Sequence, residues 1–148
     1  MRPCVLIVDD DPAIRAALQK ILRESYRVVV AADGREAARR LKEQKCDLVV
    51  LDLDLPKISG WDILDLTTSS SRPLPVVILT GFSGECAPGA LMGADALLEK
   101  PPDVALLLKT IERLLAEPAK QRAERRARWF ASAPAVALTS AGFSQVRT

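Results

Sequence analysis

Three aspartates stand directly behind apolar runs of the kind that form buried strands. Asp9 and Asp10 follow the run LIV in the segment LIVDDDP, and Asp52 ends the run LVVLD. At the carboxyl ends of parallel strands, such side chains would face the edge where open α/β sheets bind ligands. Carboxylate oxygens suit Mg²⁺, which proteins hold through one or two carboxylates together with phosphate oxygens and water. The three aspartates are therefore candidates for a site that binds a cation and a phosphate group.

Two more polar residues end later apolar runs. Thr80 closes VVILT, and Lys100 follows ALLE. If all five side chains meet at one edge, the carboxylates repel one another, because two unit charges about 4 Å apart interact by about 4 kcal/mol at an effective dielectric constant of about 20. Lys100 supplies one compensating charge, and a divalent cation would supply the remainder. Each residue alone has a simpler interpretation as a helix cap, a turn hydroxyl or a surface lysine, so the inference depends on their joint placement.

Five short apolar runs are expected to form the strands that position these residues. None alternates between polar and apolar positions, which is typical of parallel strands covered by helices on both faces. The runs cover residues 5–8, 28–31, 48–51, 76–79 and 96–98, and the predicted helices cover 12–24, 34–44 and 103–115. This alternation predicts a doubly wound α/β domain with a five-stranded parallel sheet and right-handed crossovers. In the strand order 2-1-3-4-5, the first and third strands would be neighbours and the three aspartates would share one crevice.

The composition excludes several classes of function. The chain has 148 residues, of which 49% are hydrophobic and 27% charged, as in a soluble globular domain. It has no histidine, which excludes Ser–His and Cys–His catalysis, His-ligated zinc and a phosphohistidine within the chain. Its three cysteines are widely spaced, which argues against a disulfide framework and fits a reducing compartment. No apolar run approaches the roughly 20 residues of a membrane span, and the N-terminus lacks a signal peptide, so we expect a cytoplasmic location.

The net charge of +2 is unevenly distributed along the chain. Residues 1–116 hold 15 basic and 17 acidic residues, whereas residues 117–148 hold six basic and two acidic ones. We therefore expect a domain over 1–116 and a basic extension over 117–148 that is partly helical or disordered. This extension is shorter than the roughly 60 residues that a DNA-binding output domain needs. The basic segment 119–130 fits a solvated extension at least as well as contact with an anionic membrane or an acidic protein face, and we do not expect it to bind nucleic acid.

Residues 1–116 resemble the receiver domain of bacterial two-component response regulators. The resemblance rests on LIVDDDP, LVVLDLDLPKISG, VVILTG and LLEKP, which occur in the order typical of that family. It implies the flavodoxin-like receiver fold with strand order 2-1-3-4-5, and a phosphorelay signalling protein rather than a turnover enzyme. The implied phosphodonor is a sensor histidine kinase or a phosphotransfer protein, because the chain has no histidine of its own. A downstream protein partner is also implied, and a homodimer stays open.

The resemblance also implies a role for each residue at the strand ends. Asp52 would accept the phosphoryl group. The Mg²⁺ site would consist of Asp9, Asp10, Asp52 and the backbone carbonyl of Asp54, with Asp10 as a direct ligand and Asp9 acting partly through water. Thr80 and Lys100 would contact the phosphoryl group, and the bond between Lys100 and Pro101 is a candidate cis peptide bond.

Two alternative functions stay open. The segment VVLDLDLP also resembles the nucleophile motif of haloacid-dehalogenase-type phosphatases, although in that family the motif normally follows the first strand. The other alternative is a constitutive interaction module with a receiver fold that does not switch. It is favoured by Leu97, since the receiver family usually carries Tyr or Phe three residues before the lysine.

Overall fold

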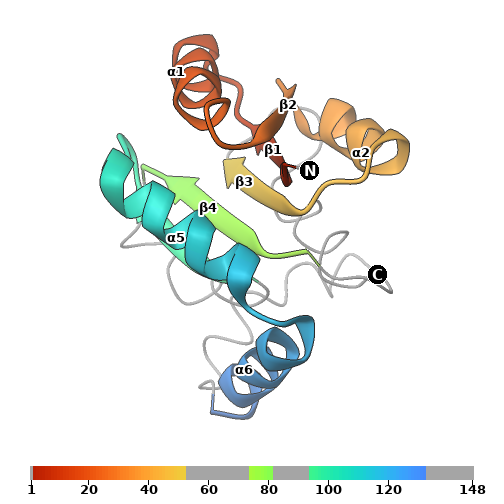
Figure 1. Ribbon diagram of the computed structural model, residues 1–148. Coiled ribbons are helices and arrows are strands. Elements are labelled where there is room, and N and C mark those ends of the chain that lie inside the picture. The colour runs from red at the N-terminus through yellow and green to blue at the C-terminus, as the bar shows by residue number, and fades with distance from the viewer. Residues whose placement is uncertain (1, 53–73, 82–93, 133–148) are drawn as a thin grey trace, which may run out of the picture.

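The computed structural model of the protein describes residues 2–52, 74–81 and 94–132 (Figure 1). Strands and helices alternate along this part of the chain, as the sequence predicts. The strands are β1 (Cys4–Val8), β2 (Arg27–Ala31), β3 (Leu48–Asp52), β4 (Val76–Thr80) and β5 (Ala96–Glu99). The helices are α1 (Pro12–Leu22), α2 (Gly34–Glu43), α5 (Val104–Ala116) and α6 (Ala119–Ser132).

The five strands form one parallel sheet in the order β2-β1-β3-β4-β5. This confirms the predicted doubly wound fold and its strand order. The β1 strand lies between β2 and β3, and Val8 at its end pairs in register with Leu51 of β3. The carboxyl ends of β1 and β3 are therefore adjacent, which is the arrangement that the three aspartates need.

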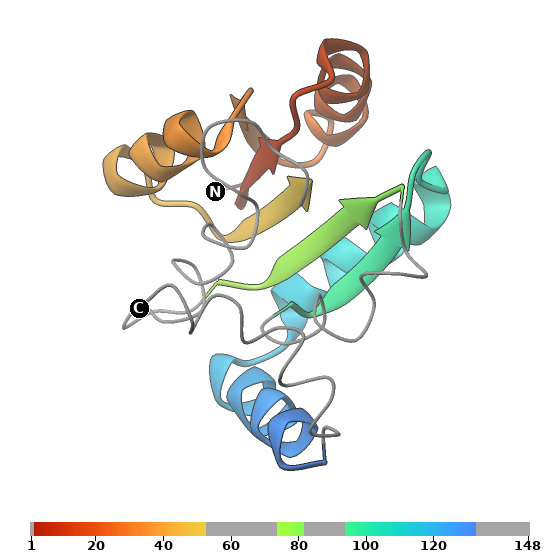
Figure 2. The ribbon, with the colours of Figure 1, turned by 180° about the vertical axis from the view of Figure 1, so that it is seen from behind.

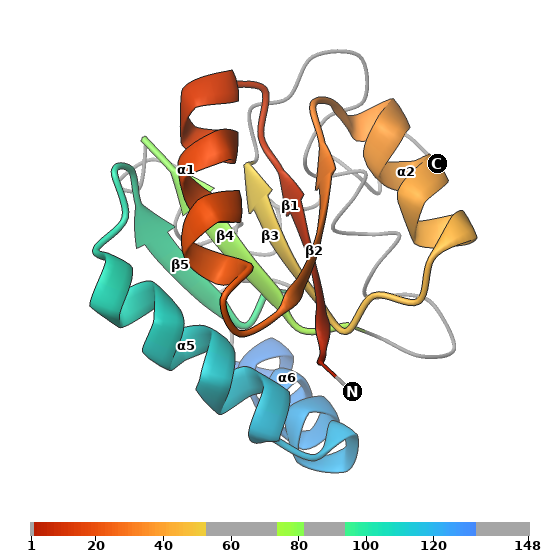
Figure 3. The same ribbon diagram turned by 45° about the horizontal axis from the view of Figure 1, so that its top comes forward.

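Helices cover the sheet on both faces, and each face has its own apolar cluster (Figure 3). Successive side chains of a strand point to opposite faces, so alternate residues of β1 enter different clusters. Leu6 packs toward α2, whereas Val5 and Ile7 pack toward α1 and α5. The residues of β1 and β3 and residues 76–79 of β4 are almost fully buried, which explains why these sequences are continuously apolar rather than alternating, whereas the outer strands β2 and β5 are only partly buried.

Aspartates begin three of the helices by accepting backbone N–H groups that lack a partner within the helix. The Asp11 carboxylate accepts the N–H of Ala13 at 2.9 Å, and Pro12 occupies the first turn, where its missing N–H costs nothing. Asp33 caps α2 and Asp103 caps α5 in the same manner. These caps fix the points at which the chain leaves β1, β2 and the segment after β5, and thereby fix the rim of the sheet.

Two of the cysteines belong to the core. Cys4 and Cys46 are buried free thiols whose sulfur atoms lie 4.0 Å apart. Burial, together with the neighbouring Cys4 thiol, raises the pKa of Cys46 to about 12. A thiol of this kind is almost entirely protonated at neutral pH, so the pair acts as small apolar side chains.

The basic helix α6 lies at the end of the sheet where the strands begin, beyond the end of α5 (Figures 1 and 2). Arg125 of this helix donates to Asp95, just before β5, at 2.6 Å and to both carboxylate oxygens of Glu117 at 2.8 and 3.1 Å. The Asp95 side chain is fully buried and also accepts the N–H of Val76 at 2.7 Å. Arg122 is buried as well. Arg125 therefore ties this segment to the domain, whereas most of the other described residues of α6 are exposed, as in a solvated extension.

Replacing Arg125 with Met should lower the free energy of unfolding by about 1–3 kcal/mol at neutral pH, since Asp95 would stay buried without its cation. The figure is at the low end for a buried pair because the Arg125 side chain is 31% exposed. The hydrogen bond from Arg125 lowers the pKa of Glu117. The part of the stabilisation that comes from Glu117 is therefore present above the ordinary pKa of glutamate and is lost as the pH falls through the lowered value.

Urea unfolding of the wild type, Arg125→Met and Lys120→Met at neutral and acidic pH measures this contribution. Lys120 is exposed on the same helix and serves as the control for the loss of one positive charge. Equal stability of Arg125→Met and Lys120→Met would show that the buried pair does not hold α6 in place.

Among the described residues, no helix combines the length and the apolar character that crossing a bilayer requires.

Candidate functional site

Asp9 and Asp52 lie side by side at the carboxyl edge of the sheet. Asp9 follows β1 directly, and its N–H donates to the carbonyl of Ala31 at 3.1 Å, so the strand geometry continues into this residue. Asp52 is the last residue of β3. Asp9 is 1% exposed and Asp52 5%, whereas Asp10 is exposed. Each of the three residues offers a carboxylate oxygen within 4.8 Å of the other two, so the structure brings the three predicted metal ligands together.

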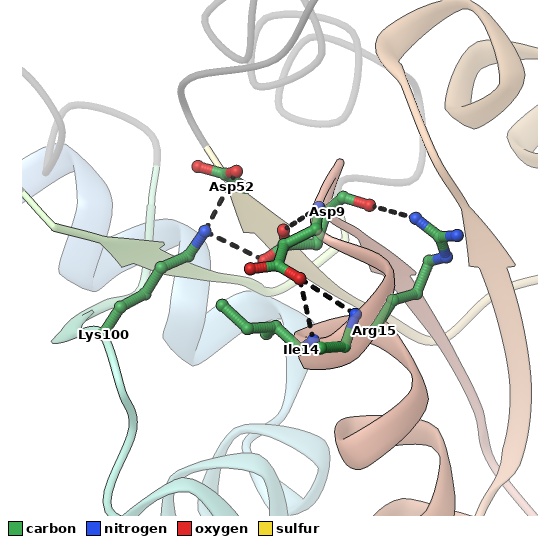
Figure 4. Close-up of polar contacts among 7 residues, drawn as sticks. Asp9, Ile14, Arg15, Asp52 and Lys100 are labelled. Atoms are coloured by element: carbon green, nitrogen blue, oxygen red, sulfur yellow. Dashed lines mark hydrogen bonds and ion pairs between the residues drawn. The ribbon is translucent and has the colours of Figure 1, made fainter.

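Lys100 brings a positive charge to the same place from the end of β5, the edge strand of the sheet. It follows β5, which is separated from β3 by β4, so its side chain extends across the end of β4 (Figure 4). Its Nζ atom lies 3.0 Å from Oδ2 of Asp9 and 3.0 Å from Oδ2 of Asp52. Burial by itself would lower the pKa of Lys100, but the contacts with the two carboxylates outweigh burial and raise the pKa. Lys100 is therefore fully charged at neutral pH.

The two carboxylate oxygens of Asp9 have different partners. Oδ1 accepts the N–H of Asp11 at 2.9 Å. Oδ2 lies 3.0 Å from Nζ of Lys100 and has no other partner among the described residues. A carboxylate oxygen can accept more than one contact, so its pairing with Lys100 leaves room for a further ligand. This oxygen therefore keeps the capacity to bind a cation or a water molecule of its hydration shell.

The charge at this edge is negative even with Lys100 in place. Among the described residues, the three carboxylates outnumber the positive groups nearest to them, the Lys100 ammonium and the Arg15 guanidinium. Carboxylate oxygens are hard ligands, and the set of donors contains no thiolate or imidazole from the described residues. Such a set fits Mg²⁺, which prefers oxygen and keeps several waters or phosphate oxygens in its shell.

Sequence reasoning missed one residue of the site. Arg15, in the first turn of α1, donates from Nη1 to the backbone carbonyl of Asp9 at 2.8 Å (Figure 4). The available signal was the spacing, since Arg15 stands four residues after the N-cap Asp11 and helical side chains lean toward the N-terminus. An arginine at that position can therefore reach back over the turn that follows β1.

The remaining predicted residues are placed only in part. The carbonyl of Asp54 and the side chain of Thr80 lie outside the described residues, although β4 does end at Thr80, as predicted. The peptide bond between Lys100 and Pro101 is cis. Leu97 is partly buried in β5 and packs against the apolar cluster on the α2 face of the sheet. Residues 133–148 of the extension, which was expected to be partly helical or disordered, also lie outside the described part.

Comparison with known proteins identifies the family. The family model for the response regulator receiver domain matches residues 5–112. The transcriptional regulatory protein AfsQ1 of Streptomyces coelicolor is 36% identical over 102 residues, which cover 67% of this chain and 45% of AfsQ1. The chain thus spans about half the length of the curated relatives that it matches.

Solved structures agree with this assignment. A putative response regulator from Chloroflexus aurantiacus is 30% identical with a TM-score of 0.73, covering 79% of this chain and all of that one. The response regulator TrrA of Thermotoga maritima, solved in complex with Mg²⁺-BeF, is 28% identical with a TM-score of 0.70, covering 76% of this chain and 98% of that one. With the fold, the acidic edge and the lysine at the end of β5, these matches show that the chain belongs to the response regulator receiver domain family.

Proposed function

We propose that this protein is a phosphoacceptor of a two-component phosphorelay that is phosphorylated on Asp52 and signals by contacts with other proteins. One observation carries the proposal: the carboxylates of Asp9, Asp10 and Asp52 converge within 4.8 Å, and Lys100 pairs with two of them at 3.0 Å. Membership of the receiver family supports the same function.

In the proposed reaction, a carboxylate oxygen of Asp52 attacks the phosphorus atom of the donor. The bond between phosphorus and the donor's leaving group breaks, and the leaving group departs with the bonding electron pair. The product is an acyl phosphate on Asp52. The protein contributes little covalent chemistry of its own, because phosphoryl transfer depends mainly on alignment and on neutralising the phosphoryl oxygens.

Two residues supply that neutralisation and alignment in our proposal. The Lys100 ammonium would move its pairing from the Asp52 carboxylate to a phosphoryl oxygen, where it stabilises developing negative charge. The hydroxyl of Thr80, at the end of the adjacent strand β4, would donate to another phosphoryl oxygen and draw the loop after β4 toward the site.

The proposed cation site consists of Asp9, Asp10 and Asp52 together with the backbone carbonyl of Asp54. The convergence of the three carboxylates and the all-oxygen donor set support this assignment. Mg²⁺ bound there would neutralise the carboxylates and screen the incoming phosphoryl group from them.

The proposed phosphodonor is a sensor histidine kinase or a phosphotransfer protein, since this chain has no histidine. The proposed recipient of the signal is a downstream protein partner, and a homodimer is an additional proposed state. A cytoplasmic location is also proposed, because the three widely spaced cysteines do not have the pattern of a disulfide framework.

Incubation with Mg²⁺ and acetyl phosphate followed by intact-mass measurement tests the proposed function. We expect the mass of one phosphoryl group to appear, because the site supplies an acceptor and a cation, and we expect EDTA to prevent its appearance. Absence of the label in Mg²⁺ would contradict the proposal. Sustained hydrolysis of a phosphomonoester over many turnovers would favour the phosphatase alternative instead.

A second comparison separates a switching receiver from a constitutive interaction module. Partner affinity is measured with and without beryllofluoride, which occupies the place of the phosphoryl group. We expect the affinity to differ between the two states, because a new dianionic group changes the charge at the ends of β3 and β4. Identical affinities would show that the fold acts without a phosphorylation switch.

A further inference from the structure

The three proposed cation ligands are held in very different ways. Asp9 is buried and fixed through its N–H, its carbonyl and both carboxylate oxygens. Asp10 is exposed, and its carboxylate makes no hydrogen bond or ion pair with any described residue. Its carboxylate nevertheless lies within 4.8 Å of the other two. Since no side chain of the described residues holds Asp10, its position within this part of the chain depends on the backbone.

The backbone around Asp10 is held from both sides. The N–H of Asp11 donates to Oδ1 of Asp9 at 2.9 Å, which closes a tight turn with Asp10 at its centre. The peptide group between Asp9 and Asp10 is then fixed by Arg15, whose Nη1 donates to the carbonyl of Asp9 at 2.8 Å. Rotation of this peptide group would break the Arg15 contact and swing the Cα–Cβ bond of Asp10 away from the site.

Arg15 is itself anchored by the start of α1. Its own N–H donates to the carbonyl of Asp11 at 3.0 Å, so its backbone is part of the first helical turn. The side chain is half-buried and runs back toward the N-terminus, the direction that helical side chains favour. The guanidinium therefore connects the rigid end of the helix to the strand end that carries two of the proposed ligands.

We propose that Arg15 is a positioning residue of the cation site, which sets the place of the Asp10 carboxylate by fixing the peptide group between Asp9 and Asp10. This inference rests on the proposed function only in taking Asp10 as a cation ligand. It differs from a role for Arg15 as a counter-charge, and the two roles predict opposite effects on cation affinity. A nearby positive charge repels Mg²⁺, so its removal alone would tighten binding, whereas loss of the fixed geometry would weaken binding.

Calorimetric titration of the full chain with Mg²⁺ alone distinguishes these roles. We expect Arg15→Met to weaken Mg²⁺ binding by about tenfold, the range found when residues that orient metal ligands are removed. Lys20→Met removes one charge from an exposed position about 7.5 Å further along α1 and should leave the affinity within twofold of the wild type. Unchanged or tighter binding by Arg15→Met would overturn the proposal.

Arg15→Lys tests the same point in a variant that keeps the charge. A lysine has a single donor at a different reach, so we expect an affinity between those of the wild type and Arg15→Met. If circular dichroism shows that Arg15→Met does not fold, the Mg²⁺ affinity of Arg15→Lys decides between the two roles. An affinity at least threefold weaker than that of the wild type supports the positioning role, and the wild-type affinity overturns it. Failure of the wild type to bind Mg²⁺ would instead contradict the proposed function, so the two failures are distinguishable.

Discussion

Replacing Asp52 with Asn should abolish phosphorylation by acetyl phosphate in the presence of Mg²⁺. The amide nitrogen and oxygen of Asn are far weaker nucleophiles than a carboxylate, and no acyl phosphate can form on them. The substitution changes little in shape at a residue that is 5% exposed, so the variant should remain folded. Intact-mass measurement after incubation with Mg²⁺ and acetyl phosphate should show the phosphoryl group on the wild type and none on Asp52→Asn.

Asp103→Asn provides a matched control for this prediction. Asp103 is the exposed N-cap of α5, and asparagine caps helices about as well as aspartate. We expect this variant to be labelled as fast as the wild type. Labelling of Asp52→Asn at the wild-type rate would place the acceptor on another residue and would contradict the proposed chemistry.

Replacing Lys100 with Met should have two large effects. The first is on phosphorylation, which we expect to slow by about 100-fold or more, as when one charged donor to a transition state is removed. The second is on stability. In the absence of a cation, Asp9 and Asp52 would remain buried without their common partner, which should cost about 2–4 kcal/mol at neutral pH.

The stability effect depends on pH and on Mg²⁺ in ways that can be checked. The contacts with Asp9 and Asp52 raise the pKa of Lys100, so its contribution is fully present at neutral pH and is lost only as the pH rises through that raised value. Thermal unfolding in EDTA and in Mg²⁺ should show a larger rise in Tm with Mg²⁺ for Lys100→Met than for the wild type. Lys109→Met, at an exposed position of α5, should behave as the wild type. An equal rise in Tm for Lys100→Met and the wild type would mean that the lysine and the cation do not share the same carboxylates.

The sequence was sufficient to predict the sheet and the acidic edge. Continuous apolar runs are typical of parallel strands covered by helices, and their alternation with amphipathic helices indicates a doubly wound fold. Residues that directly follow such runs must lie at the carboxyl edge. The sequence could therefore place Asp9, Asp52 and Lys100 at the same edge of the sheet, because the direction of each strand fixes the position of its last residue whatever conformation the side chain adopts.

Contacts that depend on the conformation of a long side chain could not be predicted from the pattern of strands and helices. Arg15 reaches a backbone carbonyl, and its spacing from the N-cap Asp11 shows only that such a contact is possible, because an arginine at that position can equally extend into solvent. Arg125 meets the buried Asp95 only because α6 turns back toward the start of β5, and no hydrophobic period of α6 signals that turn. In both cases a long flexible side chain contacts a group on another secondary-structure element. The charge composition of the segment does not predict which group that is.

Calorimetric titration of Mg²⁺ into the wild type and Asp10→Asn tests the central claim most directly. The account predicts a single site in the wild type and binding weakened by about tenfold or more in Asp10→Asn, because one of three converging carboxylates is lost. Asp103→Asn should retain the wild-type affinity. Equal affinities for the wild type and Asp10→Asn, or no binding by the wild type, would contradict the claim that these aspartates jointly hold a cation beside the acceptor.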